Sequence, residues 1–546
     1  MSGHSTDVDV LVVGAGPTGL ALASQLLRFG TRFRIVDKQV DRHHESRALG
    51  VQARTLEILQ VLGLGEELVS RGRSTTHLKL HVDPSESLKI DLGHVDRHDT
   101  RFPFILFVSQ QETEGVLTDH LVAGGVVIER GVELTSVQPE PEKVTCVVQR
   151  SDGHSESITA TYVVGCDGAH STVRKAAGIL YEGAAYSQHF VLGDVEADGL
   201  EVDEIHAFPG GRGVAIFFPL GRPTTWRVIA IEAGEPAPPD RLADEEVTTH
   251  PLSLPELQSM IEAPTFGSVR LRDAAWLTRF RLHHRQASHY RSGRMFLAGD
   301  AAHIHSPVGA QGMNTGIQDA WNLGWKLALA IARRADDRLL DSYHAERWPV
   351  GRTLLRVTDR IFGVLARSAS GGQVMESIRR LLLRGIVAPA MSRPKVRALA
   401  FHFVSQLGIH YRSSPIVREA EPRLEAGPRA GDRLPDARVE SQGLSTYLQQ
   451  ALASPRLQAL LCGPRSSWDE NEVTTLLRRF PDLLSVRYLS PGPDSLALLD
   501  VEGRALAQLG VKDRAQYLVR PDGHIAFRCA GADLSHLASY MAESFR

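Results

Sequence analysis

The sequence predicts an α/β protein of more than one domain, with a nucleotide-binding unit at its N-terminus. An apolar, strand-like run, Val10–Val13, leads into a Gly-rich turn and an Ala/Leu-rich helix that stops at Gly30. This strand–turn–helix order is typical of Rossmann-like domains. The chain has 546 residues, whereas single cores cluster near roughly 100–200 residues, so two or three domains are expected.

Composition and charge exclude several classes of protein. Hydrophobic residues make up 42% and charged residues 23% of the chain, as in an ordinary globular protein. A net charge of -3 gives no reason to expect nucleic acid or an anionic membrane as partner. No run approaches the roughly 18–20 apolar residues of a membrane helix. The N-terminus lacks a signal-peptide pattern.

Cysteine usage indicates a reducing compartment. The four cysteines, Cys146, Cys166, Cys462 and Cys529, form no CxxC pair and no metal-ligand spacing. This pattern argues against a disulfide framework or a zinc site. The HxH pair His303 and His305 has no acidic or His partner at helical spacing, so it predicts no metal either. We therefore expect a cytoplasmic protein.

Each glycine of the turn Gly14–Gly19 has a predicted task. Gly14 makes the tight turn, Gly16 lets the backbone approach a pyrophosphate, and Gly19 lets the helix pack closely on the strand. Pro17 and Thr18 begin the helix, whose free N–H groups and positive dipole end favour the pyrophosphate.

A second strand is predicted at Phe33–Val36 and ends in Asp37 and Lys38. A carboxylate at this position accepts a hydrogen bond from a ribose hydroxyl. Turn and carboxylate together predict a dinucleotide site, but they do not distinguish FAD from NAD(P).

Two further motifs lie far along the chain. The strand Tyr162–Cys166 is followed by Asp167–Arg174, and the strand Arg294–Ala298 is followed by Gly299–His303. Next, Pro307–Thr315 opens a helix whose apolar residues recur at the helical period, which predicts one buried face; they are Ile317, Ala320, Gly324, Leu327, Ala328 and Ile331.

These three motifs, in this order and at roughly this spacing, resemble the group A FAD-dependent aromatic hydroxylases. This superfamily includes para-hydroxybenzoate hydroxylase and phenol hydroxylase. The chain is most similar in style to bacterial hydroxylases of polyketides, chlorophenols and phenylpropionates that carry a C-terminal thioredoxin-like domain. The resemblance covers the whole chain. It implies non-covalent FAD, NADPH or NADH as co-substrate, and O2 with a small aromatic substrate as partners. A homodimer stays open.

The resemblance also implies site residues from both ends of the chain. Asp300 would accept from the ribityl hydroxyls, although a helix N-cap role is equally compatible. The helix start at Gly312, Met313 and Asn314 would stabilise the anionic reduced flavin ring. The other implied cofactor contacts are Gly14, Gly16, Pro17, Thr18, Gly19, Asp37, Lys38, Arg47, Gln110, Asp167, Gly168, Arg174, Gly299 and Pro307.

Among these residues, Arg47 and Pro307 match family positions beside the flavin and the substrate, and they are the predicted catalytic residues. Gln110 matches a Gln near the ribityl chain. Asp167 and Arg174 match a motif that serves both the FAD pyrophosphate and NADPH. For that motif an N-cap at Ser171 with a surface Arg174 remains the alternative interpretation.

The same comparison divides the chain into three domains. The discontinuous FAD-binding domain comprises 1–75, 105–185 and 281–400, the substrate-binding mixed-sheet domain comprises 76–104 and 186–280, and the thioredoxin-like domain comprises 401–546. A Pro-, Gly- and Arg-rich loop, Glu421–Pro435, is predicted to be a linker. The runs on either side of Pro521-Asp522-Gly523 predict a β-hairpin. Because Cys462 lacks a CxxC partner, we expect a structural or dimer-contact role for the last domain.

The expected reaction is hydroxylation of an activated aromatic ring through a C4a-hydroperoxyflavin. Epoxidation or Baeyer–Villiger oxidation of a polycyclic substrate by the same flavin chemistry remains the alternative. A halogenase would need a Trp-x-Trp element, and a two-fingerprint Baeyer–Villiger enzyme would need a second GxGxxG; the chain has neither. A non-enzymatic flavin sensor is disfavoured by three intact motifs. The substrate pocket is expected around residues 190–280, where Phe217 and Phe218 alternate in a strand.

Overall fold

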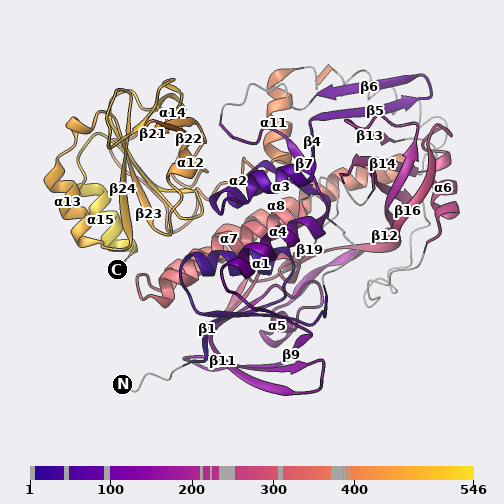
Figure 1. Ribbon diagram of the computed structural model, residues 1–546, viewed down its shortest axis with the longest axis horizontal. Helices are drawn as coiled ribbons and strands as arrows, with labels where there is room; N and C mark the ends of the chain where they lie inside the picture. Colours follow the sequence, from indigo (N-terminus) through magenta and orange to yellow (C-terminus); the bar gives the residue numbers. More distant parts are fainter. Residues whose placement is uncertain are drawn as a thin grey trace.

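The computed structural model describes residues 6–41, 48–91, 99–209, 213–221, 224–232, 252–304, 311–369, 385, 389–390 and 393–545, without the side chains of 185–189, 280–282 and 361–369. It shows the expected mixed α/β architecture, with three large sheets and long central helices (Figure 1). The predicted arrangement of strands and helices around the Gly-rich turn is confirmed.

The first sheet has the strand order β17–β18–β11–β1–β2–β8, and β10 and β9 extend it beyond β11. Its central pairs are parallel and in register: Val13 lies opposite both Val36 and Gly165, and Gly165 lies opposite Leu297. Four strands therefore end at one edge of the sheet. Their bounds are β1 (Val8–Val13), β2 (Phe33–Asp37), β8 (Ile128–Arg130), β9 (Val132–Pro139), β10 (Val144–Arg150), β11 (Ser155–Gly165), β17 (Arg291–Ser292) and β18 (Met295–Leu297).

Helices α1 (Pro17–Arg28) and α4 (Gln110–Ala123) pack beside each other in this region, and α1 also packs against α7 (Gly312–Ile331). The prediction of a single buried face on α7 was wrong, because every residue from Asn314 to Leu329 is buried. The helix crosses the middle of the molecule beside α8 (Asp337–Ala369) (Figure 1). Its polar side chains must therefore find partners inside the protein.

The second sheet has the order β19–β16–β12–β15–β14–β13–β5–β6. Two antiparallel strands of 18 residues, β12 and β16, form its spine. The predicted domain boundaries at 185/186 and 280/281 fall within these two strands. The bounds are β5 (His77–Asp83), β6 (Glu86–Asp91), β12 (Tyr181–Asp198), β13 (Ile205–Phe208), β14 (Gly213–Pro219), β15 (Trp226–Glu232), β16 (Arg270–Ala287) and β19 (His303–Ile304).

The third sheet lies in the C-terminal part, with the order β20–β27–β26–β23–β24–β25–β21–β22. The predicted hairpin is present as β26 and β27. Its thioredoxin-like character stays a prediction. The bounds are β20 (Arg418–Glu419), β21 (Arg438–Ser441), β22 (Leu444–Tyr447), β23 (Leu457–Cys462), β24 (Leu484–Ser490), β25 (Leu498–Leu499), β26 (Ala515–Val519) and β27 (Ile525–Ala530).

The predicted linker Glu421–Pro435 is not a free connection. The Gly431 N–H donates to Ile525 O at 2.7 Å and the Leu434 N–H donates to Gly523 O at 2.9 Å. These bonds attach the segment to the C-terminal hairpin because buried backbone groups need partners. The predicted domain boundary at 400/401 falls inside α11 (Pro394–Val404).

The remaining elements connect these layers. A small sheet has the order β3–β7–β4. Its strands and the other helices are β3 (Gly50–Val51), β4 (Arg73–Thr75), β7 (Ile105–Phe107), α2 (Ala53–Val61), α3 (Gly65–Arg71), α5 (Thr172–Ala176), α6 (Leu254–Glu262), α12 (Leu448–Ala451), α13 (Glu470–Arg479), α14 (Arg504–Gln508) and α15 (Ser535–Ser544). Within the part of the chain that the structure describes, no helix has the length and apolar character needed to cross a membrane.

Candidate active site

A cavity of about 430 Å³ opens where the strands of the first sheet end. Because β1, β2, β11 and β18 run parallel and in register, their carboxyl ends bring distant sequence motifs to one edge. Ligands of open α/β sheets bind at such an edge. The predicted residues that line the cavity are Gly14, Gly16, Pro17, Thr18, Asp37, Lys38, Gln110, Asp167, Gly168, Asp300, Gly312 and Met313.

The three glycines of the turn have different surroundings. Gly14 has φ +103°, and a Cβ there would lie 2.3 Å from Cys166 O. A Cβ on Gly19 would lie 1.9 Å from Gly14 O, so Gly19 is needed for packing and does not line the cavity. A Cβ on Gly16 would meet nothing within 4 Å. Gly14 and Gly19 therefore shape the turn, while Gly16 keeps space open beside it.

Asp37 holds the turn as well as lining the cavity. Its Oδ2 accepts from the Ala15 N–H at 2.6 Å, and its Oδ1 accepts from the Gln39 N–H at 2.8 Å. A carboxylate has further lone pairs, so Asp37 can still accept from a ligand hydroxyl. Arg130 lies opposite Asp37 in the β2–β8 register and also lines the cavity.

In the motif after β11, the predicted N-cap at Ser171 is confirmed, the predicted surface position of Arg174 is wrong because Arg174 is buried, and the cofactor role stays a prediction. Asp167 Oδ2 accepts from the Thr172 N–H at 2.7 Å, and Ser171 Oγ accepts from the Arg174 N–H at 3.0 Å, so both side chains cap α5. Burial raises the pKa of Asp167. Arg174 does not line the cavity; its guanidinium donates to Ala169 O and Ala301 O at 2.8 and 3.1 Å. Arg174 thus joins two loops at the cavity edge.

The loop after β18 packs on the Gly-rich helix. Gly299 has φ +62°, and a Cβ there would lie 2.5 Å from Thr18 Oγ1. Its N–H donates at 3.1 Å to the Oδ2 atom of Asp319, a residue of α7. Asp300 is exposed and lines the cavity, while its carbonyl accepts from Tyr181 Oη at 2.8 Å. The Asp300 side chain is therefore presented at the cavity by a fixed backbone.

Asp319 is a buried acceptor that the motifs did not reveal. It accepts from His303 Nε2 at 2.7 Å and from Arg347 Nε at 2.6 Å. Burial opposes ionisation of Asp319, but Arg347 and His303 outweigh it and hold the pKa of Asp319 below its ordinary value. His303 is thus an anchor of the loop, and no group of possible metal ligands occurs among the described residues.

The start of α7 forms another wall. Gly312 and Met313 line the cavity, where the helix N-terminus favours negative charge. Asn314 points elsewhere: its Nδ2 donates to Gly50 O at 2.8 Å and its Oδ1 accepts from the Gln52 N–H at 2.9 Å. Asn314 therefore fastens α7 to the segment that leads into α2.

The opposite wall comes from the second sheet. Phe218 lines the cavity, whereas Phe217 is fully buried in the core behind it. The other residues that this sheet contributes are Leu192, Arg227, Ile229, His283 and Ile304. This wall is largely apolar, and Arg227 and His283 are its ionisable members among the described residues.

Arg227 is held by a buried carboxylate. It lies opposite Asp194 in the β12–β15 register, and its Nε and Nη2 donate to the two Asp194 oxygens at 2.6 and 2.7 Å. Trp276 Nε1 donates to the same carboxylate at 2.8 Å. Arg227 Nη1 donates to Ala48 O at 2.9 Å. The second sheet thus holds the backbone that directly follows Arg47.

The two predicted catalytic residues, Arg47 and Pro307, lie outside the described residues, as does His305. Gln110 Oε1 accepts from the Ala48 N–H at 3.3 Å. Arg227 and Asp319 carry no local motif, so only their partners in the fold reveal them.

Both cysteines of the C-terminal part are shielded from solvent. Cys462 and Cys529 are free and buried. Burial raises the pKa of the Cys529 thiol to about 11, and it raises that of Cys462 as well. Such thiols are poor nucleophiles because the thiolate is the reactive form.

The cavity fits an extended dinucleotide on two counts. The absence of a Cβ at Gly16 leaves space that most side chains would fill. Asp167 Oδ1 is buried and has no hydrogen-bond partner among the described residues, although Asp167 lines the cavity. A buried acceptor without a partner is costly, which is consistent with a ligand that donates to it.

Comparison with known proteins agrees with this geometry. Residues 7–358 match the family described as FAD binding domain. The chain is 35% identical over 524 residues to 6-methylpretetramide 4-monooxygenase of Streptomyces rimosus, covering 95% of this chain and 90% of that protein. It is 32% identical over 442 residues to pentachlorophenol 4-monooxygenase of Sphingobium chlorophenolicum, covering 80% and 77%. The crystal structure of CabE, an aromatic hydroxylase from angucycline biosynthesis, has 30% identity and a TM-score of 0.75, covering 99% and 100%.

The fold, the cavity and the similarity to these proteins define this protein as a flavin-dependent monooxygenase. The chain belongs to the FAD binding domain family, within the group A flavin hydroxylases.

Proposed function

We propose that the protein hydroxylates an activated aromatic ring, phenolic or polyketide-like, with FAD, O2 and NADPH or NADH. One observation carries the proposal: a single cavity runs from the strand-end edge of the first sheet to the largely apolar wall of the second. An extended cofactor at the edge would place its reactive end beside that wall. The similar proteins named for phenolic and polyketide oxidation support the substrate class.

The roles of the edge residues follow from their positions. The turn Gly14–Gly19 and the N-terminus of α1 would hold the pyrophosphate. Asp37 would accept from the adenosine ribose and Asp300 from the ribityl hydroxyls, while Gly312 and Met313 would place the helix N-terminus at the ring. The proposed contacts also include Lys38, Gln110, Asp167 and Gly168 at the cavity, and Arg47 and Pro307 beside the ring.

FAD supplies the redox chemistry, because the cofactor carries electrons from the nicotinamide to O2. The protein binds, orients and excludes water. Leu192, Phe218, Ile229 and Ile304 supply an apolar surface for an aromatic ring. His283, in the same wall, is placed to hold or take a proton at a substrate oxygen.

The test is a screen of phenols and polyketide aromatics for compounds that stimulate NADPH or NADH oxidation. We expect a product heavier by one oxygen atom, and its NMR spectrum separates hydroxylation from epoxide or lactone formation. The control is Gly16→Val, which should fold but lose stimulated oxidation. If FAD binds and no aromatic raises nicotinamide consumption above the basal rate, the proposal is wrong.

A further inference from the structure

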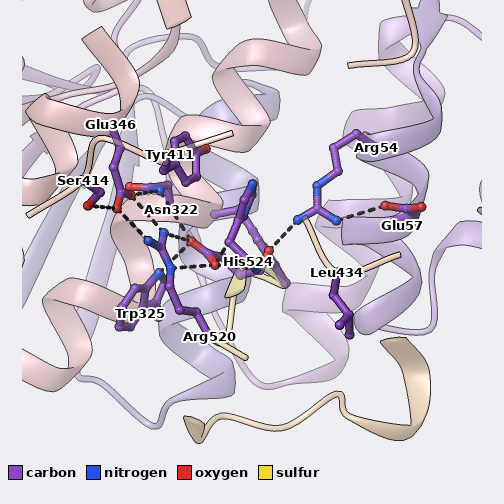
Figure 2. A network of polar contacts seen from close by, with 12 residues as sticks. Arg54, Glu57, Asn322, Trp325, Glu346, Tyr411, Ser414, Leu434, Arg520 and His524 are labelled. Atoms are coloured by element: carbon purple, nitrogen blue, oxygen red, sulfur yellow. Dashed lines mark hydrogen bonds and ion pairs between the residues drawn. The ribbon is translucent and has the colours of Figure 1, made fainter. Parts of the chain in front are cut away.

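The turn of the C-terminal hairpin, Arg520–His524, is buried against helices α2, α7 and α8. Figure 2 shows its side chains among residues of α2, α7 and α8. Arg520, Asp522 and His524 are all buried. Surface turns are normally solvated, so this one is part of an internal contact.

Arg520 reaches α8 through a buried ion pair. Its Nη1 and Nη2 donate to the two oxygens of Glu346 at 2.6 and 2.9 Å. Lys326 Nζ, from α7, donates to the same carboxylate at 2.7 Å. Burial opposes ionisation of Glu346, but the two cations hold its pKa at about 2. Glu346 therefore joins the hairpin to both central helices (Figure 2).

Asp522 joins the hairpin to α7 and α2 together. Its Oδ2 accepts from Trp325 Nε1 at 3.2 Å and from Asn322 Nδ2 at 3.5 Å. Its carbonyl oxygen accepts from Arg54 Nη2 at 2.5 Å, and Arg54 is the second residue of α2. One turn is thus hydrogen-bonded to two helices.

Helices α7 and α2 are also joined near the cavity, through Asn314 at the start of α7. Asn314 of α7 holds Gly50 and Gln52, directly before α2, and Ala48 and Leu49 just upstream line the cavity. From Met313 to Asn322 is about 14 Å along a helix. A shift of α7 against α2 at the hairpin would therefore reach the walls.

A second connection runs through α8. Arg347 follows Glu346, and its Nε donates to Asp319, which in turn accepts from the Gly299 N–H. Arg347 Nη1 donates to Tyr411 Oη at 3.0 Å, and the Tyr411 ring lies 4.3 Å from that of His524. The hairpin is thus connected to the loop that presents Asp300.

We propose that Arg520 and Asp522 are positioning residues for the flavin site, holding α2 and α7 at the spacing that FAD requires. The C-terminal part of the chain would then complete the site without touching the cofactor. The inference rests on the flavin site proposed above. The experiment therefore measures the energetic coupling between the hairpin and the flavin site.

The experiment uses the full chain and titrates FAD into apoprotein by flavin fluorescence, with the visible spectrum of bound FAD and thermal unfolding as parallel readouts. Asp522→Asn should weaken FAD affinity at least about tenfold, because it replaces acceptors for Trp325 and Arg520 by an amide. Trp325→Phe, which removes one donor and keeps a ring, should weaken it about threefold. The matched control is Arg418→Met, which breaks an exposed ion pair with Glu543 in the same part of the chain.

A double-mutant cycle separates positioning from mere stability. If the hairpin acts through α7, Asp522→Asn and Asn314→Ala should affect FAD affinity non-additively. We also expect the visible spectrum of bound FAD to change in both Asp522→Asn and Asn314→Ala. Unchanged FAD affinity and spectrum in folded Asp522→Asn and Trp325→Phe overturn the inference, even if thermal stability falls, and so does an additive cycle.

Two further outcomes are decisive. If Asp522→Asn does not fold, Trp325→Phe and Arg54→Met decide, and unchanged affinity in both overturns the inference. If the unaltered protein binds no FAD, the flavin site itself is wrong and the inference falls with it.

Discussion

The two walls of the cavity are built by different physical means. On the first sheet, turns and helix starts contribute backbone, and the missing Cβ at Gly16 leaves space beside it, while charged side chains such as Asp37 and Asp300 also line the cavity. On the second sheet, side chains form a largely apolar wall, and Asp194 holds Arg227 there through a buried ion pair. We expect the first wall to bind the cofactor and the second wall to bind the aromatic substrate.

The largest expected effect lies on the second wall. Arg227→Met leaves Asp194 buried without its cation, so the free energy of unfolding should fall by about 3–5 kcal/mol. The measurement is urea unfolding followed by tryptophan fluorescence. Arg227→Met combined with Asp194→Leu should recover most of the loss. The control, Arg272→Met, breaks an exposed pair with Asp198 on the same sheet and should cost at most about 1 kcal/mol. If Arg227→Met and Arg272→Met lower the free energy of unfolding equally, the buried ion pair does not stabilise the second sheet as proposed.

The first wall should respond in the opposite way. Gly16→Val points a side chain into open space, so the fold should persist while FAD affinity drops roughly a hundredfold, about 2.7 kcal/mol. Thermal unfolding and a fluorescence titration of FAD measure the two effects. Gly492→Val is the matched control because its added Cβ also meets nothing within 4 Å. Unimpaired FAD binding would remove the turn from the cofactor site.

A smaller effect is expected from Asp300, an exposed carboxylate of the first wall. Asp300→Ala should lower FAD affinity about tenfold to a hundredfold, since a hydrogen bond to a charged group contributes about 1.5–3 kcal/mol. FAD content after extensive dialysis checks this. Asp300→Asn keeps an acceptor and should lose less. A full FAD content in the alanine variant would exclude a direct contact.

The smallest effect concerns communication between the walls. We expect reduction of FAD by NADPH to be at least about tenfold faster with a cognate aromatic, about 1.4 kcal/mol of activation free energy. The reason is that substrate on the second wall would bias the flavin toward a reducible position. Anaerobic stopped-flow absorbance measures both rates. Equal rates with a substrate that is demonstrably hydroxylated would refute the gating and leave the hydroxylase assignment intact.

The difference between the walls explains what the sequence revealed. Gly14 and Gly16 follow a local pattern because the strand, the turn and the helix start are contiguous, and Asp37 ends the next strand; the structure brings all three to one cavity. The pairing of Asp194 with Arg227 depends on strand register, which spacing alone does not give. Likewise Asp319 is one polar residue of α7, and only burial of that helix on all sides shows that it needs partners.

The long strands β12 and β16 have a mechanical consequence for access to the cavity. Tyr181, where β12 begins, is bonded to the Asp300 loop, and the same strand runs on to Asp194 and the second wall. The register of β12 against β16 shifts between Ala185 and His189 and at two places between Asp194 and Ala197, but the antiparallel pairing resumes after each shift and joins the two strands over most of their length. The two walls are therefore connected through one pair of long strands. We expect a bulky ring to be admitted by displacement of loops or cofactor, with little opening of one domain away from the other.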